Sequence, residues 1–259
     1  MYRKTSKLDK LKLYYPKLTF CTEEELDKIF KNHEIESVIH CATNYGYNQI
    51  DFTDIIDSNY ILPSNILKLS IKYNVKYFIN TDSLINKNIS LYSLSKTHFK
   101  ELSKFLSDEI NFINLRLDHF YGPGDNQSKF LIKIIHDFLD NKKELDLTLG
   151  EQKRRFLYID DLTIAILLII NNLNLFKNFV QIDITGEKLY SIKEVVLLTK
   201  SLCSNHNTKL NWGAIDYRKN EIFEPKANLN TIKNLGWKQN INLEEGIKNT
   251  ILSNKKWYI

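Results

Sequence analysis

Apolar and polar positions alternate in two different periods along the first half of the chain. Short apolar runs rich in β-branched and aromatic residues end at turn formers, which is typical of buried strands. These runs cover residues 37–43, 75–81 and 111–117. Helical periodicity lies between them, over residues 54–73 and 92–107. Repeated strand–helix–strand units of this length predict an α/β fold with a Rossmann-like parallel sheet and helices on both faces.

Two local signals refine this pattern near the N-terminus. Residues 17–22 read as a further short strand, and Thr22 with Glu25 reads as a capping box ahead of a helix. Pro63 falls inside the periodicity of residues 54–73, where it predicts a kink. From Lys129 onward the pattern is less regular and the strands are shorter. We therefore predict a partial dinucleotide-binding domain at residues 1–128 and a smaller substrate-binding lobe at 129–259, the two being interleaved.

Composition excludes several classes of protein. The 259 residues are 43% hydrophobic and carry a net charge of +5, with lysines dispersed among acidic residues rather than gathered in a patch, so we expect no nucleic-acid partner. The three cysteines include no CxxC pair and the six histidines no HxxxH or HExxH spacing, so we expect no metal site. The longest apolar run, residues 162–170, is about half a membrane span. We expect a cytoplasmic protein without a membrane partner.

The residues with candidate chemistry are Tyr92 and Lys96, four apart at the start of a predicted helix. A tyrosine is a poor acid–base catalyst at pH 7 unless a nearby ammonium lowers its pKa, and a lysine one turn away supplies such a charge. Thr81, at the end of the preceding strand, adds a hydroxyl. Tyr and Lys are abundant here, so a chance surface pair is the competing interpretation; the strand, hydroxyl, loop and helix in order favour the site.

Six ordered motifs between residues 17 and 251 resemble the extended short-chain dehydrogenase/reductase family of nucleotide-sugar epimerases, dehydratases and reductases. They are VIHCAT, VKYFINTDS, YSLSK, LRLDHFYGPGD, GEQKRRFLYIDDL, and LGW followed by LEEGI. The resemblance implies Thr81, Tyr92 and Lys96 as catalytic residues. It implies NAD or NADP as the cofactor, contacted by Cys41, Ala42 and His119 together with Tyr92 and Lys96. A structural role for His119 is an equal alternative.

The resemblance further implies a nucleotide-sugar substrate contacted by Asp82, Ser83, Tyr121, Arg154 and Arg218. The two arginines would bind the diphosphate, for which a guanidinium is well suited. The alternative for Arg154 is a solvated cluster with its neighbours Lys153 and Arg155. The family's dimers imply a homodimer by analogy.

The sequence departs from the family in its first segment. Its first glycine is Gly46, so the family's glycine-rich turn, which lets backbone N–H groups reach a pyrophosphate, is missing. Roughly 40–50 residues of a family N-terminus have no counterpart, which predicts that dinucleotide binding is weakened or lost. We consider three explanations: a mis-assigned start or interrupted frame, an inactive remnant, or completion by a partner.

A second departure concerns the reaction. The dehydratase branch has a carboxylate where this chain has Ser83, which argues against dehydration. NTDS, YSLSK, FYGPGD and YRKNEI together resemble CDP-deoxysugar reductases and epimerases of surface-polysaccharide pathways. The sequence thus predicts an NAD(P)-dependent nucleotide-sugar epimerase or 4-keto-reductase. The alternative is a non-catalytic or degenerate family member that binds a sugar nucleotide or a protein partner.

Overall fold

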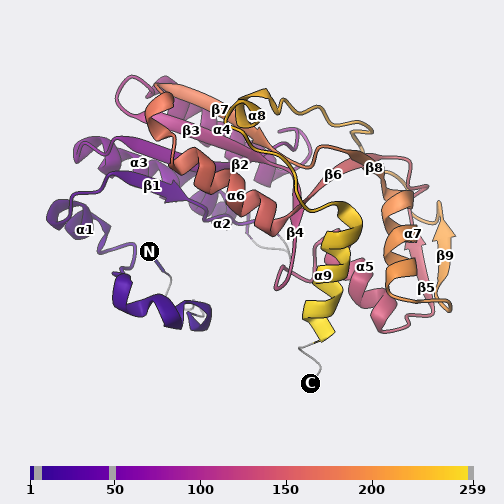
Figure 1. The fold of residues 1–259 in the computed structure, drawn as a ribbon. Coiled ribbons are helices and arrows are strands. Elements are labelled where there is room, and N and C mark those ends of the chain that lie inside the picture. Colours follow the sequence, from indigo (N-terminus) through magenta and orange to yellow (C-terminus); the bar gives the residue numbers. More distant parts are fainter. Residues whose placement is uncertain (3–7, 47–50, 256–259) are drawn as a thin grey trace. The chain divides into compact units, whose positions relative to one another are not determined.

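A computed structural model describes residues 1–2, 8–46 and 51–255, and the chain divides into two compact units (Figure 1). Unit 1 comprises residues 1–80, 95–114 and 176–180, and unit 2 comprises residues 81–94, 115–175 and 181–259. The chain crosses between the units within several strands and one helix. The lobes expected at 1–128 and 129–259 stay a prediction.

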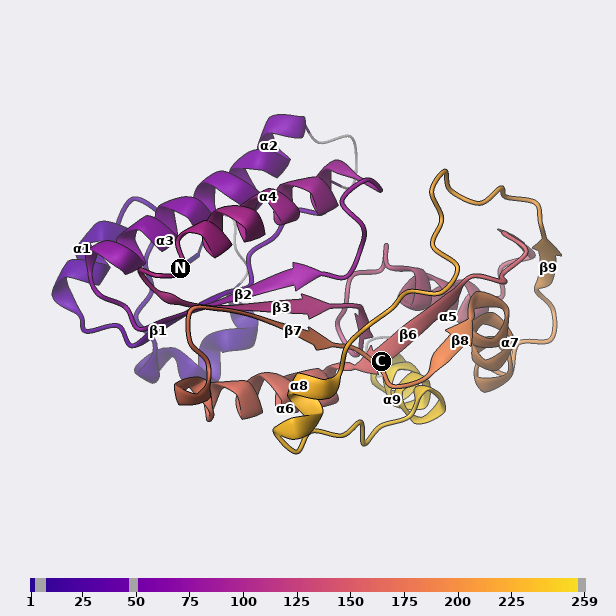
Figure 2. The ribbon, with the colours of Figure 1, turned by 90° about the horizontal axis from the view of Figure 1, so that it is seen from above.

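Unit 1 contains most of a four-stranded sheet in the order β1-β2-β3-β7. Its strands are β1 (Ser37–His40), β2 (Tyr77–Ser83), β3 (Asn111–Leu117) and β7 (Phe179–Ile184). Strands β1 and β2 pair in parallel, with Ser37 opposite Tyr77 and His40 opposite Asn80. The arrows of β2, β3 and β7 point the same way in Figure 2. The α/β fold with a parallel sheet that the pattern predicted is therefore confirmed.

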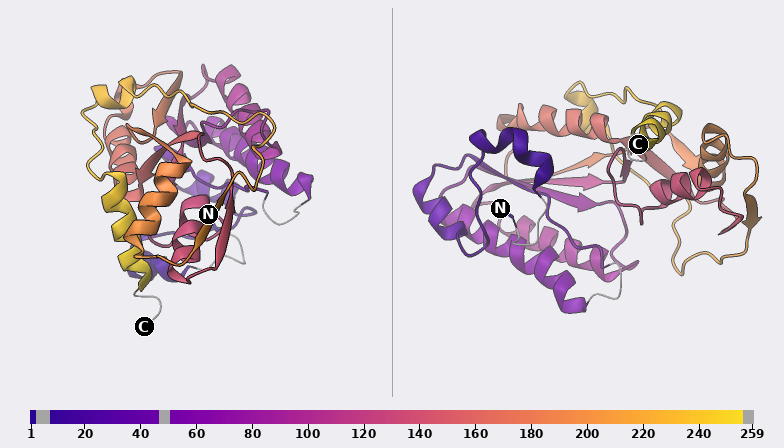
Figure 3. Two further views of the ribbon diagram at one scale, coloured as in Figure 1. Left: turned by 90° about the vertical axis from the view of Figure 1, so that its right-hand side faces the viewer. Right: turned by 90° about the horizontal axis from the view of Figure 1, so that it is seen from below.

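Helices cover one face of this sheet. They are α1 (Leu26–Asn32), α2 (Phe52–Ile56), α3 (Leu62–Lys72) and α4 (Leu91–Phe105). Figure 2 and Figure 3 show α3 and α4 side by side on that face. Phe99 of α4 packs edge-on against Phe78 and Phe112, and the rings of Phe112 and Phe179 stack at 5.8 Å. This aromatic core ties β2, β3 and β7 to α4 because stacked and edge-on rings add to ordinary apolar burial.

Two predicted elements of unit 1 differ from the structure. Residues 17–22 form no strand: a 3₁₀-helix, η1 (Asp9–Lys17), ends there and an extended segment follows it. No strand of the described residues pairs with this segment, and beyond its local turn bonds one backbone bond, from the Tyr2 N–H to the Cys21 carbonyl, holds it among the described residues. Only half of the predicted capping box forms: the Glu25 carboxylate accepts from the Thr22 N–H at 2.8 Å, but the Glu25 N–H bonds the Thr22 carbonyl, and α1 begins only at Leu26.

The helix predicted over residues 54–73 is interrupted. A π-helical turn, η2 (Asp57–Ile61), separates α2 from α3. Pro63 lacks the N–H that an α-helix would direct to the carbonyl of residue 59, and the Leu62 N–H instead reaches back five residues to Asp57. The expected kink is thus a π-turn.

Unit 2 is built on two further sheets and a separate apolar core. Strands β4 (His119–Tyr121), β6 (Lys153–Tyr158) and β8 (Leu189–Ser191) form one sheet, in which β4 runs parallel and β8 antiparallel to β6. Strands β5 (Glu144–Leu147) and β9 (Lys209–Trp212) form a parallel pair. The helices are α5 (Phe130–Leu139), α6 (Ile159–Ile170), α7 (Ile192–Leu202), α8 (Asn230–Asn234) and α9 (Leu243–Lys255), with a short 3₁₀ turn, η3 (Leu173–Leu175).

The core of unit 2 lies where α5, α7 and α9 pack on β4 and β6. Ile135, Phe138, Val195 and Ile247 are almost completely buried there. Asp161 of α6 is fully buried and does not cap its helix: its carboxylate accepts the backbone N–H groups of Asn240 and Ile241 and so anchors the loop before α9. None of the helices in the part of the chain that the structure describes is long and apolar enough to cross a membrane.

Gly246 of α9 allows the closest approach in this core. A Cβ atom at this position would lie 2.2 Å from the hydroxyl oxygen of Tyr121, which is buried and donates a hydrogen bond to the Leu243 carbonyl. We expect Gly246→Ala to lower the free energy of unfolding by about 1–2 kcal/mol, because overpacking outweighs the gain in helix propensity. Urea denaturation of this variant, with Glu245→Ala on the exposed side of α9 as control, measures the effect. An increase in stability would contradict the tight packing.

Candidate active site

Helix α4 carries both residues of the Tyr–Lys pair in its first two turns. The helix is capped by two serines: the Ser90 hydroxyl accepts the Ser93 N–H at 3.2 Å, and the Ser93 hydroxyl accepts the Ser90 N–H at 3.1 Å. Tyr92 is 9% exposed and Lys96 only 2%. A lysine is almost never so deeply buried unless its ammonium has partners. The chance surface pair is therefore ruled out as an account of Lys96.

Strand β2 ends in two hydroxyl residues with a carboxylate between them. Thr81 and Ser83 are half-buried, whereas Asp82 is buried and its carboxylate accepts the Ser83 N–H at 2.7 Å. Residues two apart on a strand share a face, so both hydroxyls lie on one face of β2, with Ser83 nearer its carboxyl end. The Ser83 hydroxyl accepts the Ile85 N–H at 3.1 Å. Either residue could supply the hydroxyl group that the sequence analysis placed at Thr81.

A row of buried polar side chains crosses the sheet of unit 1. The Asn80 amide donates to Asn114 Oδ1 at 2.9 Å, which leaves Asn80 Oδ1 facing His40 Nδ1 at 2.9 Å. Because a carbonyl oxygen only accepts, Nδ1 of His40 carries the proton. The three side chains are at most 4% exposed. The row is not predicted by the sequence pattern, because His40, Asn80 and Asn114 are each accompanied by other polar residues in their apolar runs.

Burial lowers the pKa of His40 to about 4; the Asn80 hydrogen bond opposes this shift and the charge of Lys96 adds to it. His40 is therefore neutral at pH 7. Its electrostatic link to Lys96 connects the polar row of the sheet to the candidate catalytic lysine of α4.

Asn59, in the π-turn η2, anchors the loop that follows β1. Its side-chain oxygen accepts the Asn44 N–H at 2.8 Å, and its amide donates to the Asn44 carbonyl at 2.8 Å and to the Ser95 hydroxyl at 3.2 Å. The loop between β1 and Asn44 carries Cys41 and Ala42, the expected cofactor contacts. Cys41 is exposed rather than buried in a strand, because β1 ends at His40.

Two of the five expected substrate residues, Arg154 and Arg218, line a cavity of about 100 Å³ in unit 2, whereas Asp82, Ser83 and Tyr121 do not. The lining consists of Leu84, Ile85, Ile89, Asp118, His119, Arg154, Arg218, Glu221, Ile222 and Pro225. Apolar side chains here face two arginines and two carboxylates, which suits a ligand with both charged and apolar parts. His119, Arg154 and Arg218, expected from separate motifs, are thus brought together.

Arg154 is not part of a solvated cluster. Its side chain is 15% exposed, forms an ion pair with Glu221, and donates to the Ile222 carbonyl at 2.8 Å and to the Lys153 carbonyl at 2.6 Å. Arg218 is exposed. An anionic ligand would therefore meet Arg218 freely but compete with Glu221 for Arg154.

Tyr121 lies away from this cavity, in the core of unit 2. It is 3% exposed, packs against Phe156 and Tyr158, and burial raises the pKa of its phenol. Its placement is that of a packing residue, and its contact with substrate stays a prediction.

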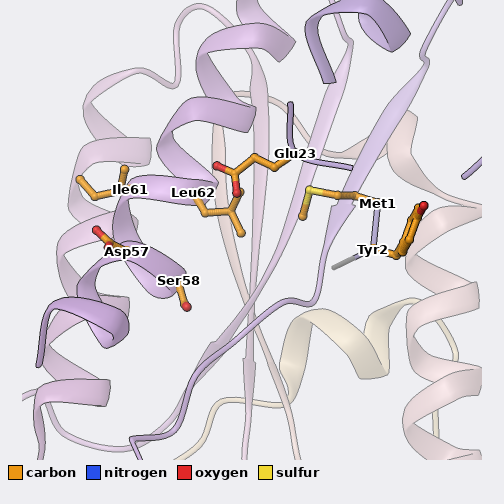
Figure 4. Close-up of a pocket in the computed structure, with 7 residues that line it drawn as sticks. All are labelled: Met1, Tyr2, Glu23, Asp57, Ser58, Ile61 and Leu62. Carbon is orange, nitrogen blue, oxygen red and sulfur yellow. The ribbon is translucent and has the colours of Figure 1, made fainter. Parts of the chain in front are cut away.

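A second cavity, of about 390 Å³, lies in unit 1 (Figure 4). Its lining consists of Met1, Tyr2, Glu23, Asp57, Ser58, Ile61 and Leu62. None of the residues expected in the active site contributes to it. Among the described residues, no cluster of three histidine, cysteine or carboxylate side chains could hold a metal ion.

Comparison with known proteins agrees with this arrangement. The model of the NAD-dependent epimerase/dehydratase family matches residues 2–184. The chain is 33% identical over 243 residues to a CDP-abequose synthase of Salmonella typhimurium, covering 88% of this chain and 81% of that protein. A UDP-glucose 4-epimerase of Thermotoga maritima, solved with UDP-glucose, superposes with a TM-score of 0.79 at 22% identity, covering 92% of this chain and 82% of that one. A UDP-glucose 4-epimerase of Thermus thermophilus, solved with NAD, gives a TM-score of 0.76 at 14% identity, covering 90% and 82%.

The pKa of His40 generates a pH prediction. A histidine whose pKa is lowered on folding has no effect on stability above its unfolded pKa of 6.5, and destabilises the fold as the pH falls towards 4, because only the unfolded chain then takes up the proton. We expect this residue to remove about 3 kcal/mol of stability between pH 6.5 and pH 4. Urea denaturation as a function of pH should show a shallower acid decline for His40→Asn than for the original chain. His33→Asn, at an exposed position, is the control, and parallel curves for His40→Asn and the original chain would contradict the burial effect.

Proposed function

Because this chain belongs to the NAD-dependent epimerase/dehydratase family, we propose that it is an NAD(P)-dependent nucleotide-sugar epimerase or 4-keto-reductase. The observation that carries the proposal is the almost complete burial of Lys96 one helical turn from Tyr92. A buried ammonium beside a phenol favours the phenolate and so prepares Tyr92 for proton transfer near neutral pH. The similarity to CDP-abequose synthase supports a sugar nucleotide as substrate and a place in deoxysugar synthesis for surface polysaccharides.

In this proposal each residue has one task. Tyr92 takes the proton from a sugar hydroxyl or returns it to a keto oxygen, and Lys96 lowers the pKa of Tyr92. Thr81 or Ser83 donates a hydrogen bond to the same sugar oxygen. Arg218 and Arg154 bind the diphosphate, with Arg154 released from Glu221 as the ligand enters. Asp82 is held by the Ser83 N–H, and Ser83 brings no second carboxylate, which is why we do not propose dehydration.

The residues present fit one end of a dinucleotide better than the other. Tyr92, Lys96 and the loop that carries Cys41 and Ala42 are suited to the nicotinamide ribose. When bound, the cofactor would exchange a hydride with a sugar carbon. In residues 8–46, however, β1 is the one strand and no glycine-rich turn leads from a strand into a helix, so these residues offer no cradle for a pyrophosphate.

We expect Tyr92→Phe to lower turnover of a sugar nucleotide about 100-fold to 10,000-fold, the usual contribution of a general acid–base. Tyr14→Phe, at an exposed position of η1, should leave turnover unchanged. Thr81→Val and Ser83→Ala, measured in parallel, identify the hydroxyl donor as the position with the larger loss. Consumption of one NAD(P)H per product indicates reduction, whereas turnover without net consumption indicates epimerisation. Normal turnover by Tyr92→Phe would overturn the mechanism.

We further expect the 259-residue chain to bind NADH and NADPH only weakly, with a Kd above about 0.1 mM, because residues 8–46 contain no glycine-rich turn whose backbone N–H groups could bind the pyrophosphate. Titration of the purified chain, followed by nicotinamide fluorescence, measures this affinity. Micromolar binding would contradict the expectation. Sugar-nucleotide binding without any dinucleotide binding would favour a non-catalytic family member.

A further inference from the structure

Asp118 lies between β3 and β4, and its two carboxylate oxygens differ in their hydrogen bonding among the described residues. Its side chain is 6% exposed, and its Oδ1 pairs with Nδ1 of His119 at 2.5 Å. Its Oδ2 is buried and has no hydrogen-bond partner among the residues that the structure describes. Asp118 and His119 both line the cavity of unit 2. A residue that lines the cavity therefore has a buried carboxylate oxygen without a donor among the described residues.

Such an acceptor is costly in a folded protein. Buried polar atoms are nearly always hydrogen-bonded, and a charged one left without a donor loses its hydration with no compensation. The His119 contact also holds the carboxylate in one orientation, because it fixes Oδ1. The arrangement is that of a site prepared for a ligand that brings the missing donor.

The charges and apolar residues that line the cavity determine which kind of hydrogen-bond donor a ligand could bring to Asp118. A phosphate group is excluded at Asp118 because two anions would repel each other, and Glu221 adds a further negative charge to the lining. A hydroxyl can donate to Oδ2. Leu84, Ile85 and Ile89 supply apolar surface of the kind that covers the C–H face of a sugar ring, while Arg218 remains for an attached phosphate.

We propose that Oδ2 of Asp118 accepts a hydrogen bond from a hydroxyl of the sugar ring of the substrate, so that Asp118 determines which sugars the site accepts. This inference rests on the proposed function, since it takes the ligand to be a sugar nucleotide. A site built to pair with a hydroxyl rejects analogues that lack it much more strongly than an apolar pocket does, because the buried acceptor is then left unpaired. His119 acts as a positioning residue for the carboxylate.

Calorimetric titration with CDP, CDP-glucose and UDP-glucose tests this assignment in the original chain and in Asp118→Asn. The asparagine keeps the volume and an acceptor for His119, but directs a donor into the cavity. We expect Asp118→Asn to weaken binding of the sugar nucleotide about tenfold to hundredfold and to change CDP binding less than twofold. Asp125→Asn is the matched control: its Oδ2 is likewise buried without a partner among the described residues, but Asp125 does not line the cavity.

A second arm needs no variant and so does not depend on whether Asp118→Asn folds. CDP-glucose analogues that each lack one hydroxyl are titrated into the original chain, and one of them should lose affinity to the same extent as Asp118→Asn loses it for CDP-glucose. That analogue should bind the variant no more weakly than CDP-glucose does.

Three outcomes overturn the proposal. Equal losses for CDP and CDP-glucose would show a merely structural role, and unchanged binding of CDP-glucose to Asp118→Asn would show no contact. If the original chain binds neither CDP-glucose nor UDP-glucose, the proposed function itself fails and this inference with it. Sugar-nucleotide binding that is insensitive to Asp118 leaves the proposed function standing and removes only the inference.

Discussion

The parallel pairing of β1 with β2 is the constraint on which the candidate active site depends. The register sets His40 opposite Asn80, and only in this register does the polar row extend through Asn80 to Asn114. A slip of β1 by one residue would turn His40 to the other face of the sheet and break its contact with Asn80. Burial in this row lowers the pKa of His40, with the charge of Lys96 adding to the shift and the Asn80 hydrogen bond opposing it, so His40 is neutral at pH 7. The chemistry assigned to α4 is thus linked to the backbone pairing of the sheet.

In the cavity of unit 2, ion pairs and hydrogen bonds set the positions of the charged side chains. Arg154 is held by Glu221 and by two carbonyl oxygens, so its position is determined before any ligand arrives. Arg218 is exposed, and Asp118 is held through His119. A ligand in this cavity must bring a negatively charged group to the two arginines and a hydrogen-bond donor to Asp118. This combination is suited to a molecule with an anionic part and a hydroxylated part, which is the character of a sugar nucleotide.

Three features show where local sequence and tertiary structure differ: the segment 17–22, the helix over residues 54–73 and the side chain of Tyr121. Residues 17–22 have the composition of a strand, but a strand forms only where a neighbouring strand supplies a ladder of hydrogen bonds, and beyond local turns the described residues offer one backbone bond. Periodicity predicts one kinked helix over residues 54–73. Because Pro63 has no N–H to donate, a π-helical turn forms there, in which the Leu62 N–H bonds the Asp57 carbonyl. The substrate contact that the motif suggests for Tyr121 stays a prediction, and its ring packs in the core beside Gly246. The outcome for residues 17–22 depended on a partner strand distant in the sequence, whereas the π-turn before Pro63 has a local cause.

The sequence by itself determined the α/β class, the positions of three strands of the parallel sheet, the helix that carries Tyr92 and Lys96, and the family; the first of these strands, β1, is only partly buried, with Ile39 exposed. These properties follow from local periodicity and from residues close together in the chain, such as the YSLSK spacing. Tertiary structure alone decided that Lys96 is buried, that Arg154 pairs with Glu221 across 67 residues, and that Asp118 keeps one oxygen without a partner among the described residues. Burial and pairing of charge depend on which elements pack together, and the hydrophobic pattern of one segment does not indicate which other segments it will contact.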